Sequence, residues 1–161
     1  EAMTSKGYDT SARLISIALV HPSKEVRESL ALQASEDVVE VKRVRYLNRE
    51  PVSVDISYFP LHIGEKLFSR DLTGDIFPML ENQFSIPLGR ADIRLEARAA
   101  ESESADLLMI ETGSPVMWVQ RLTFDANGQP VDFEYLTFRG DAYQYRFKVE
   151  RKDLGPAGDT S

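Results

Sequence analysis

Two arginines that stand two positions apart are the strongest indication of a binding site in this sequence. Arg43 and Arg45 lie in a run with the period-two alternation of a β-strand, so both side chains are expected on one face of it. Two guanidinium groups on one face can clamp a carboxylate or a phosphate through paired hydrogen bonds. A surface ladder of ion pairs with Glu40, Glu50 or Asp55 explains the same pattern equally well.

Acidic residues form the second group with possible chemistry. Asp55, Asp132 and Glu134 fall in the strands that follow the arginine strands, and Asp132 and Glu134 share one face. Paired carboxylates can act as general acid and base, or they can bind hydroxyls or an amine. Binding is the expected use, because no nucleophile or metal-ligand set accompanies them in the sequence. Asp75 is predicted to cap a helix, where it would compete with a ligand anion for the backbone amides.

The sequence offers little else that points to catalysis. His21 and His62 have no metal-ligand spacing, and cysteine is absent from the chain. No glycine-rich phosphate loop, nucleophile elbow or zinc motif is present, so no catalytic residue, metal or cofactor is expected. Trp118 lies in a predicted strand and is expected in the core.

The elements that must position these residues occur twice. Residues 41–55 and 119–134 both read as a strand with arginine, a polar turn, and a Pro-Val step that opens a second strand with acids. Each unit is a predicted β-hairpin, with Asn48 or Asn127-Gly128 in the turn. Arg121 corresponds to Arg43, but Thr123 stands where Arg45 has its counterpart. A cleft between such unequal halves would hold a ligand in one orientation.

Each half is predicted to contain a strand, a short helix and the hairpin, which gives an α+β fold. The predicted strands are 13–20, 38–46 and 52–59 in the first half, then 91–99, 116–124 and 131–138, with a last strand at 143–149. The predicted helices are 24–34, 71–84 with Asp75 as N-cap, and a helix from Ser102 or Ser104 to Met109.

Composition limits the function further. The 161 residues suit one domain, no apolar run approaches the roughly 18 residues of a membrane span, and no secretory signal is recognisable. A formal charge of −7 argues against direct binding of nucleic acid. A cytoplasmic location is expected, with a flexible tail at 152–161 that is rich in Gly, Pro and small polar residues.

Several segments, taken in order and spacing, resemble the effector-binding (UTRA) domain of HutC-type GntR transcription regulators over residues 1–151. They are Gly7 to Arg13, Arg43-Val44-Arg45-Tyr46, Glu50-Pro51-Val52, Phe59-Pro60-Leu61, Gly74-Asp75-Ile76-Phe77, Gln129-Pro130-Val131, and Phe138-Arg139-Gly140-Asp141 with Tyr143. The resemblance implies a chorismate-lyase-like fold, in which a pseudo-duplicated antiparallel sheet is flanked by short helices. It also implies a metabolite pocket, a homodimer, and an N-terminal winged helix-turn-helix domain that binds operator DNA and is absent from this chain.

The resemblance also implies roles for single residues. In members that bind phosphorylated amino sugars, two arginines and helix amides hold the phosphate, while acids and a tyrosine hold the sugar. The arginines match Arg43 and Arg45, and Asp75 and Phe77 stand in place of a serine and a tyrosine. The family's glutamates match Asp55 and Asp132, and Phe138 replaces its last tyrosine. The lost hydroxyls and the added acid argue against a phosphate ester.

The expected function is therefore that of an effector-sensing domain in a repressor-type regulator, not an enzyme. Its effector is a small anionic metabolite, such as a sugar phosphate, an amino sugar or a carboxylate, and no membrane partner is expected. The predicted ligand-binding residues are Arg43, Arg45, Asp55, Asp75, Phe77, Asp132, Glu134 and Phe138. The alternatives are a chorismate-lyase-type enzyme for a small dicarboxylate and a dimerisation module without a ligand.

Overall fold

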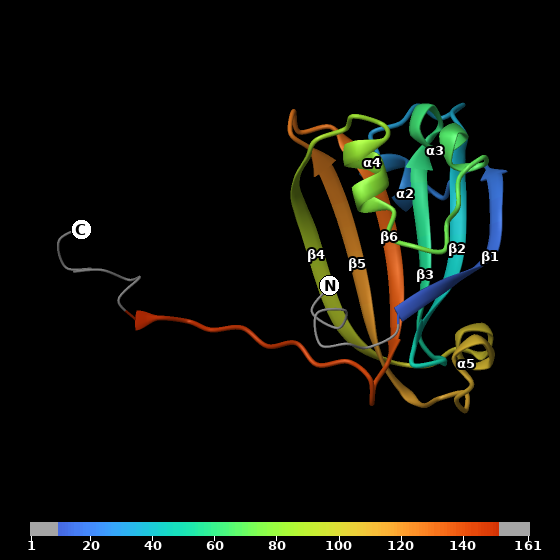
Figure 1. Ribbon diagram of the computed structural model, residues 1–161, viewed down its shortest axis with the longest axis vertical. Coiled ribbons are helices and arrows are strands. Elements are labelled where there is room, and N and C mark those ends of the chain that lie inside the picture. The colour runs from blue at the N-terminus through green and yellow to red at the C-terminus, as the bar shows by residue number, and fades with distance from the viewer. Residues whose placement is uncertain (1–9, 152–161) are drawn as a thin grey trace.

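A six-stranded antiparallel sheet forms the body of the protein (Figure 1). The computed structural model describes residues 10–151, and the predicted tail at 152–161 lies outside them. The strands are β1 (Thr10–Val20), β2 (Val38–Leu47), β3 (Glu50–Pro60), β4 (Leu88–Ala99), β5 (Pro115–Asp125) and β6 (Pro130–Arg139). Their order in the sheet is β1-β2-β3-β6-β5-β4. The two predicted halves are thus two three-strand meanders, and the expected α+β architecture is confirmed.

The halves meet where β3 pairs with β6. In this register Asp55 lies opposite Leu136, and Ser57 lies opposite Glu134. By the sequence repeat, Glu134 is the counterpart of Asp55 and Leu136 the counterpart of Ser57. The β3–β6 seam therefore relates the two halves by an approximate two-fold axis, and it brings their acids together on one face.

Tight turns close both hairpins as the sequence predicts. Asn48 and Arg49 have φ angles of 51° and 72°, the left-handed pair that a two-residue hairpin turn needs. In the second hairpin Gly128 has a φ of 84°, and the Asp125 carboxylate accepts hydrogen bonds from the Asn127 and Gln129 amides. These turns fix the register that places each arginine beside an acid.

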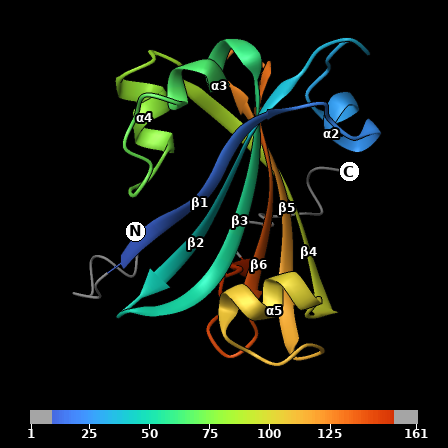
Figure 2. The same ribbon diagram turned by 90° about the vertical axis from the view of Figure 1, so that its right-hand side faces the viewer.

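Helices cover the sheet unequally (Figure 2). α3 (Leu61–Leu67) and α4 (Phe77–Asn82) pack together over one end of the face that carries Val39, Val41 and Phe59. α2 (Lys24–Ser29) packs on the opposite face around Val38 and Phe133, and α5 (Ser102–Leu108) packs on that face around Val44 and Val54. Within residues 10–151, no helix has the length and apolar character to cross a lipid bilayer.

Three helix predictions differ from the structure. α2 ends at Ser29 rather than near 34, because the chain turns at Ala31 with a φ of 57°. α4 begins at Phe77 rather than at 71, since Pro78 fits only a first helical turn. Its N-cap is Ile76, and the prediction of Asp75 as N-cap is wrong. No helix was predicted from the sequence at the position of α3.

The predicted strand at 143–149 is wrong as well. Those residues form no strand and run away from the sheet (Figure 1). The Ser23 side chain caps α2, because it accepts a hydrogen bond from the Val26 amide.

A glycine allows α3 to approach the sheet. A Cβ atom on Gly64 would overlap the side chain of Val39 on β2, so Gly64→Ala must displace the helix. Overpacking of this kind costs about 1–3 kcal/mol, and we expect a loss of that size in the free energy of unfolding measured with urea. Gly74→Ala is the matched control, because a Cβ there has no neighbour within 4 Å. An equal loss in both variants would contradict this role of Gly64.

Candidate functional site

A pocket of about 300 Å³ lies on the seam, on the face that α3 and α4 partly cover. Its lining comprises Arg43, Arg45, Asp55, Ser57, Asp75, Ile76, Phe77, Pro78, Arg121, Asp132, Glu134, Leu136 and Phe138. All eight residues predicted to bind a ligand are in this set. Six of them share one face of the sheet because the strands alternate in phase, and the loop before α4 and its first residue add Asp75 and Phe77.

The charged groups of the two halves occupy equivalent positions. Arg43 lies opposite Asp55 on β2 and β3, and Arg121 lies opposite Glu134 on β5 and β6. Cross-strand neighbours share a face, so both pairs point into the pocket. Arg121 was aligned with Arg43 in the sequence but was not among the predicted site residues. The repeat was the signal that could have placed it there.

Arg43 is buried and supports the backbone of the pocket. Its side chain is almost fully covered, and its Nη1 donates to the carbonyl oxygens of Leu72 at 3.0 Å and Gly74 at 2.7 Å. Burial lowers the pKa of Arg43, and the negative charge of Asp55 opposes that shift. The arginine thus fastens the loop between α3 and α4 over the seam.

Arg45 is the more accessible of the two predicted arginines. Its Nη2 lies 3.3 Å from Oδ1 of Asp75, and its Nη1 lies 3.9 Å from Oδ2 of Asp55. About a third of the side chain is exposed to solvent. The ladder of ion pairs that the sequence allows is therefore present in part. The guanidinium of Arg45 nevertheless remains open to the pocket. The pair with Arg45 also explains why Asp75 does not cap α4.

Arg121 closes the opposite wall. Its guanidinium binds Oε2 of Glu134 at 3.0 Å and lies 4.9 Å from the centre of the Phe77 ring. This cation–π contact ties β5 to the start of α4. Phe77 therefore serves as a wall of the site, where the resemblance placed a hydroxyl-bearing tyrosine.

Three buried acids form the floor, namely Asp55, Asp132 and Glu134. Burial raises the pKa of Asp55 to about 6, although Arg45 counteracts this shift. Burial and the adjacent Glu134 raise the pKa of Asp132 well above its ordinary value. Among the described residues, Asp132 Oδ1 and its cross-strand neighbour Thr123 Oγ1 are buried without a hydrogen-bond partner. An unpaired buried acceptor is costly, so the floor favours a ligand that donates hydrogen bonds.

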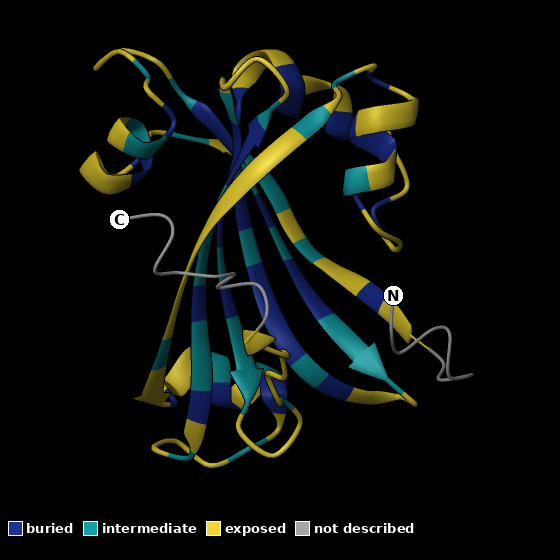
Figure 3. Cartoon of the chain, turned by 90° about the vertical axis from the view of Figure 1, so that its left-hand side faces the viewer, coloured by how far each residue is buried: buried dark blue, intermediate teal, exposed yellow. Residues whose placement is uncertain are grey.

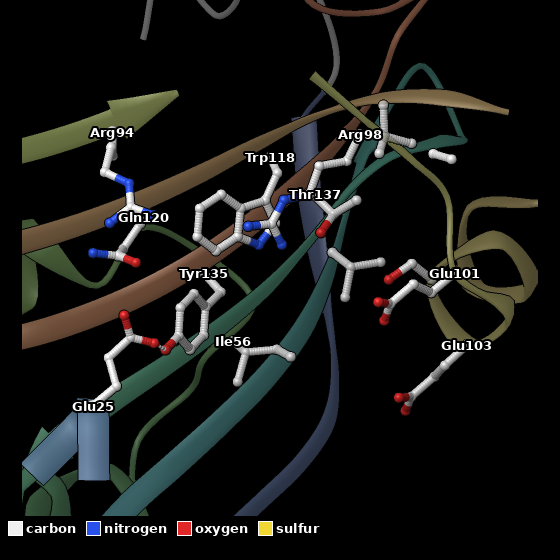
Figure 4. Close-up of a pocket in the computed structure, with 14 residues that line it drawn as sticks. Glu25, Ile56, Arg94, Arg98, Glu101, Glu103, Trp118, Gln120, Tyr135 and Thr137 are labelled. Atoms are coloured by element: carbon white, nitrogen blue, oxygen red, sulfur yellow. Dashed lines mark hydrogen bonds between the residues drawn. The ribbon is translucent and has the colours of Figure 1, made fainter. Parts of the chain in front are cut away.

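A larger hollow of about 430 Å³ lies on the opposite face between α2 and α5 (Figure 4). Its floor is the stacked pair of Trp118 and Tyr135, with ring centres 5.7 Å apart, and Arg98 lies 3.6 Å from the Trp118 ring. The expectation of a core tryptophan is wrong, because Trp118 is only partly buried and lines this hollow. Glu96 already pairs with Arg94 and Arg98 there. The seam pocket, with its buried acids and open Arg45, is the better candidate site.

Comparison with known proteins settles the family. The model of the UTRA domain matches residues 5–144. The chain belongs to the UTRA domain family. This UTRA domain is 30% identical over 151 residues to the HTH-type transcriptional repressor NagR of Bacillus subtilis, covering 94% of the chain and 62% of NagR. It is 27% identical over 123 residues to the HTH-type transcriptional regulator GgaR of Escherichia coli K12, covering 76% of the chain and 48% of GgaR.

Solved structures confirm the fold of this UTRA domain. The ligand-binding domain ascribed to a GntR-family transcriptional regulator of Bordetella bronchiseptica has a TM-score of 0.80 at 25% identity. That match covers 88% of this chain and 90% of the other. The effector domain of PhnF from Mycobacterium smegmatis has a TM-score of 0.86 at 15% identity and 92% coverage of both chains, which shows the fold alone. The chorismate-lyase-like fold expected from the sequence is the one observed. The chain spans less than two thirds of the length of NagR and of GgaR.

The two predicted arginines should differ in their effect on stability. Arg43→Met removes two hydrogen bonds from the charged guanidinium to the carbonyl oxygens of Leu72 and Gly74, so we expect a loss of about 3 kcal/mol in the free energy of unfolding. Arg45→Met removes a half-exposed ion pair, and the expected loss is below about 1 kcal/mol. Urea unfolding of both variants measures the difference. Equal losses would show that the loop does not depend on Arg43.

The buried acids should make stability depend on pH. Folding raises the pKa of Asp132, so the folded state binds a proton that the unfolded chain releases, and the free energy of unfolding falls as pH rises past the unfolded value. Asp55 adds the same trend between its ordinary 3.8 and about 6. Asp132→Asn removes the buried charge, and we expect it to stabilise the fold by about 1–3 kcal/mol at pH 8 and by less at pH 5.

Thermal unfolding at both pH values measures this effect. Asp92→Asn, at an exposed position on β4, is the control for the loss of one negative charge. Destabilisation of the Asp132→Asn variant by the same amount at pH 5 and pH 8 would mean that Asp132 is an ionised partner of the arginines.

Proposed function

We propose that this UTRA domain is the effector-sensing part of a cytoplasmic transcription regulator and binds a small anionic metabolite in the seam pocket. The observation that carries the proposal is the juxtaposition of an open arginine, Arg45, with a buried and unpaired acceptor, Asp132 Oδ1. Both groups line the same pocket, where Arg45 keeps about a third of its side chain exposed beside its pair with Asp75. A pocket of about 300 Å³ is at the lower end of the usual range for small-molecule sites.

The arrangement of charge specifies the kind of effector. Three arginines and four acids line the pocket, so the site is not a simple anion trap. Arg45 is hydrogen-bonded to Asp75. An anionic group of the effector would bind Arg45 and either displace Asp75 or share the guanidinium with it. At the other side, hydroxyl or ammonium donors of the effector would meet Asp55, Asp132 and Glu134. A carboxylate that also carries an amine or hydroxyls, or an acidic amino sugar, fits this pattern better than a phosphate ester does.

The proposed mechanism is a shift between two arrangements of a homodimer. The effector would contact strands from both halves and the start of α4, so it can favour one arrangement over the other. A winged helix-turn-helix domain that precedes this domain would transmit the shift to operator DNA. The names of NagR and GgaR as transcriptional regulators support this proposal over a chorismate-lyase-type enzyme.

A thermal-shift screen of hydroxy and amino carboxylates, amino sugars and sugar phosphates tests the proposal. A bound compound stabilises the folded state, so a hit raises the melting temperature, and its affinity is then measured by calorimetry. We expect Arg45→Ala to weaken binding of that compound by about 10- to 100-fold, the worth of a charge-assisted hydrogen bond.

Arg98→Ala is the matched control, because Arg98 lies in the hollow on the opposite face. We expect it to leave the affinity of the hit unchanged. If Arg98→Ala abolished binding and Arg45→Ala did not, the effector would bind the opposite face and the assignment of the seam pocket would be wrong.

A further inference from the structure

The hollow on the face opposite the seam pocket has no part in the function proposed above. It lies between α2 and α5, and its volume of about 430 Å³ is within the usual range for small-molecule sites (Figure 4). β4 borders the hollow at the edge of the sheet, and most residues of that strand are exposed (Figure 3). A small molecule can therefore enter from this side, and the lining determines which kind of molecule is bound.

Aromatic rings form the floor of the hollow. Trp118 and Tyr135 stack on each other, and the guanidinium of Arg98 lies 3.6 Å from the centre of the Trp118 ring. The faces of aromatic rings attract cations, so the position of Arg98 shows that this floor accepts a positive group. Val54 and Ile56 of β3 continue the lining as an apolar surface. The floor thus suits a ligand that combines positive charge with apolar parts.

The two arginines of the lining are already engaged. Nε and Nη2 of Arg98 donate to Oε1 of Glu96 at 3.1 Å and 3.0 Å, and Nη2 of Arg94 donates to Oε2 of the same carboxylate at 3.1 Å. The Trp118 ring also covers one face of the Arg98 guanidinium. One acid of β4 therefore holds both arginines against their own sheet, and neither is a free anion-binding group.

The hydrogen-bonding groups left open in the hollow are acceptors. Glu101, which is exposed just before α5, has a carboxylate without a hydrogen-bond or ion-pair partner among the described residues. Oε1 of Gln120 is buried without a partner in residues 10–151, and half a turn of the amide would present it to a ligand. Tyr135 donates its hydroxyl proton to Glu25, so that hydroxyl is no donor for a ligand. The lining therefore favours a ligand rich in N–H groups.

The charges at the hollow favour a cation as well. Lys42 pairs with Glu103 at 3.0 Å, which leaves Glu25 and Glu101 without a basic partner in the described part of the chain. These two acids lie on different sides of the hollow, with Ile56 and the Tyr135 ring between them (Figure 4). The hollow thus offers two separate anionic positions that are joined by an apolar floor. Its charged groups, including those paired with the lining, are four acids and three bases, namely Glu25, Glu96, Glu101 and Glu103 with Lys42, Arg94 and Arg98.

We propose that this hollow is a second binding site and that its ligand is an alkyl polyamine. One ammonium group would bind Glu101 at the start of α5, and another would bind Glu25 of α2 and the amide oxygen of Gln120. The methylene chain between them would lie on Ile56 and the Tyr135 ring. An ammonium group has three N–H donors and no acceptor, and its alkyl chain is apolar, so a polyamine matches both parts of the lining.

The hollow and the effector pocket call for ligands of opposite charge. The seam pocket offers the open Arg45 to an anion, whereas the hollow offers unpaired acids and aromatic rings to a cation. Successive residues of a strand point to opposite faces, so β3 contributes Asp55 to the seam pocket and Ile56 to the hollow. The sheet therefore separates the two sites, and the inference does not rest on the proposed function.

Trp118 supplies the reporter for a test, because it is the only tryptophan of the chain and lines the hollow. We expect a titration with spermidine to change its fluorescence in a saturable way and to shift its single indole resonance in a proton–nitrogen NMR spectrum. Butylamine has one ammonium group and can occupy only one end, so it should bind more weakly by about tenfold or more. An equal response to magnesium chloride at the same ionic strength would indicate charge screening and would overturn the proposal, as would the absence of a saturable response.

Substitution of single acids locates the bound amine. Glu101→Gln should weaken the binding of spermidine by about fivefold, the upper end for a partly exposed ion pair. Glu111→Gln is the matched control, because it removes an exposed acid beyond α5 and outside the hollow, and it should leave the affinity unchanged. Equal weakening by both substitutions would overturn the assignment of the hollow.

Asp132→Asn tests the seam pocket as the alternative place for the amine. Loss of spermidine binding in this variant, with full affinity in Glu101→Gln, would place the amine among the buried acids of the seam and would overturn the proposal. None of these titrations uses an effector of the seam pocket. A failed metabolite screen therefore leaves this test intact, and a failure here leaves the effector site standing.

Discussion

The pairing of β3 with β6 is the constraint on which the rest of this domain depends. It is the junction through which the two three-strand halves become one sheet. Because the repeat places an acid at equivalent positions of both strands, the junction also gathers carboxylates that belong to different halves of the chain. A shift of one residue in this register would turn the acids of one strand to the opposite face of the sheet, and the pocket would lose its charged floor. Architecture and binding chemistry are therefore set by the same ladder of hydrogen bonds.

The pocket contains buried charged side chains that do not favour folding. Asp55, Asp132 and Glu134 are nearly inaccessible, and the raised pKa values of Asp55 and Asp132 reflect the cost of burying them. The positive charges of Arg43, Arg45 and Arg121 offset part of that cost, but Asp132 Oδ1 has no hydrogen-bond partner. Buried charged groups that lower the stability of a fold and point into a cavity are typical of binding sites, where they contribute to the affinity for a ligand.

Local patterns were sufficient to predict most of this arrangement from the sequence. Alternation and turn residues located all six strands of the sheet, and the two-residue spacing of Arg43 and Arg45 gave their common face. The errors have tertiary causes. Asp75 pairs with Arg45 instead of capping α4, and α3 packs closely through Gly64, a residue that argues against a helix in any local reading. The predicted strand at 143–149 has the right alternation, but its own sheet offers it no partner.

The manner in which Arg43 holds the loop above the pocket has a consequence for how such a site can diversify. The arginine binds carbonyl oxygens of Leu72 and Gly74, and it makes no hydrogen bond to a side chain of that loop. A main-chain carbonyl is the same whatever residue carries it. The residue at position 75 can therefore be replaced while Arg43 still holds the loop in place. The selectivity of the pocket depends on side-chain atoms, and the attachment of the loop depends on main-chain atoms. A scaffold built in this way can acquire a new ligand through few substitutions without first losing its shape.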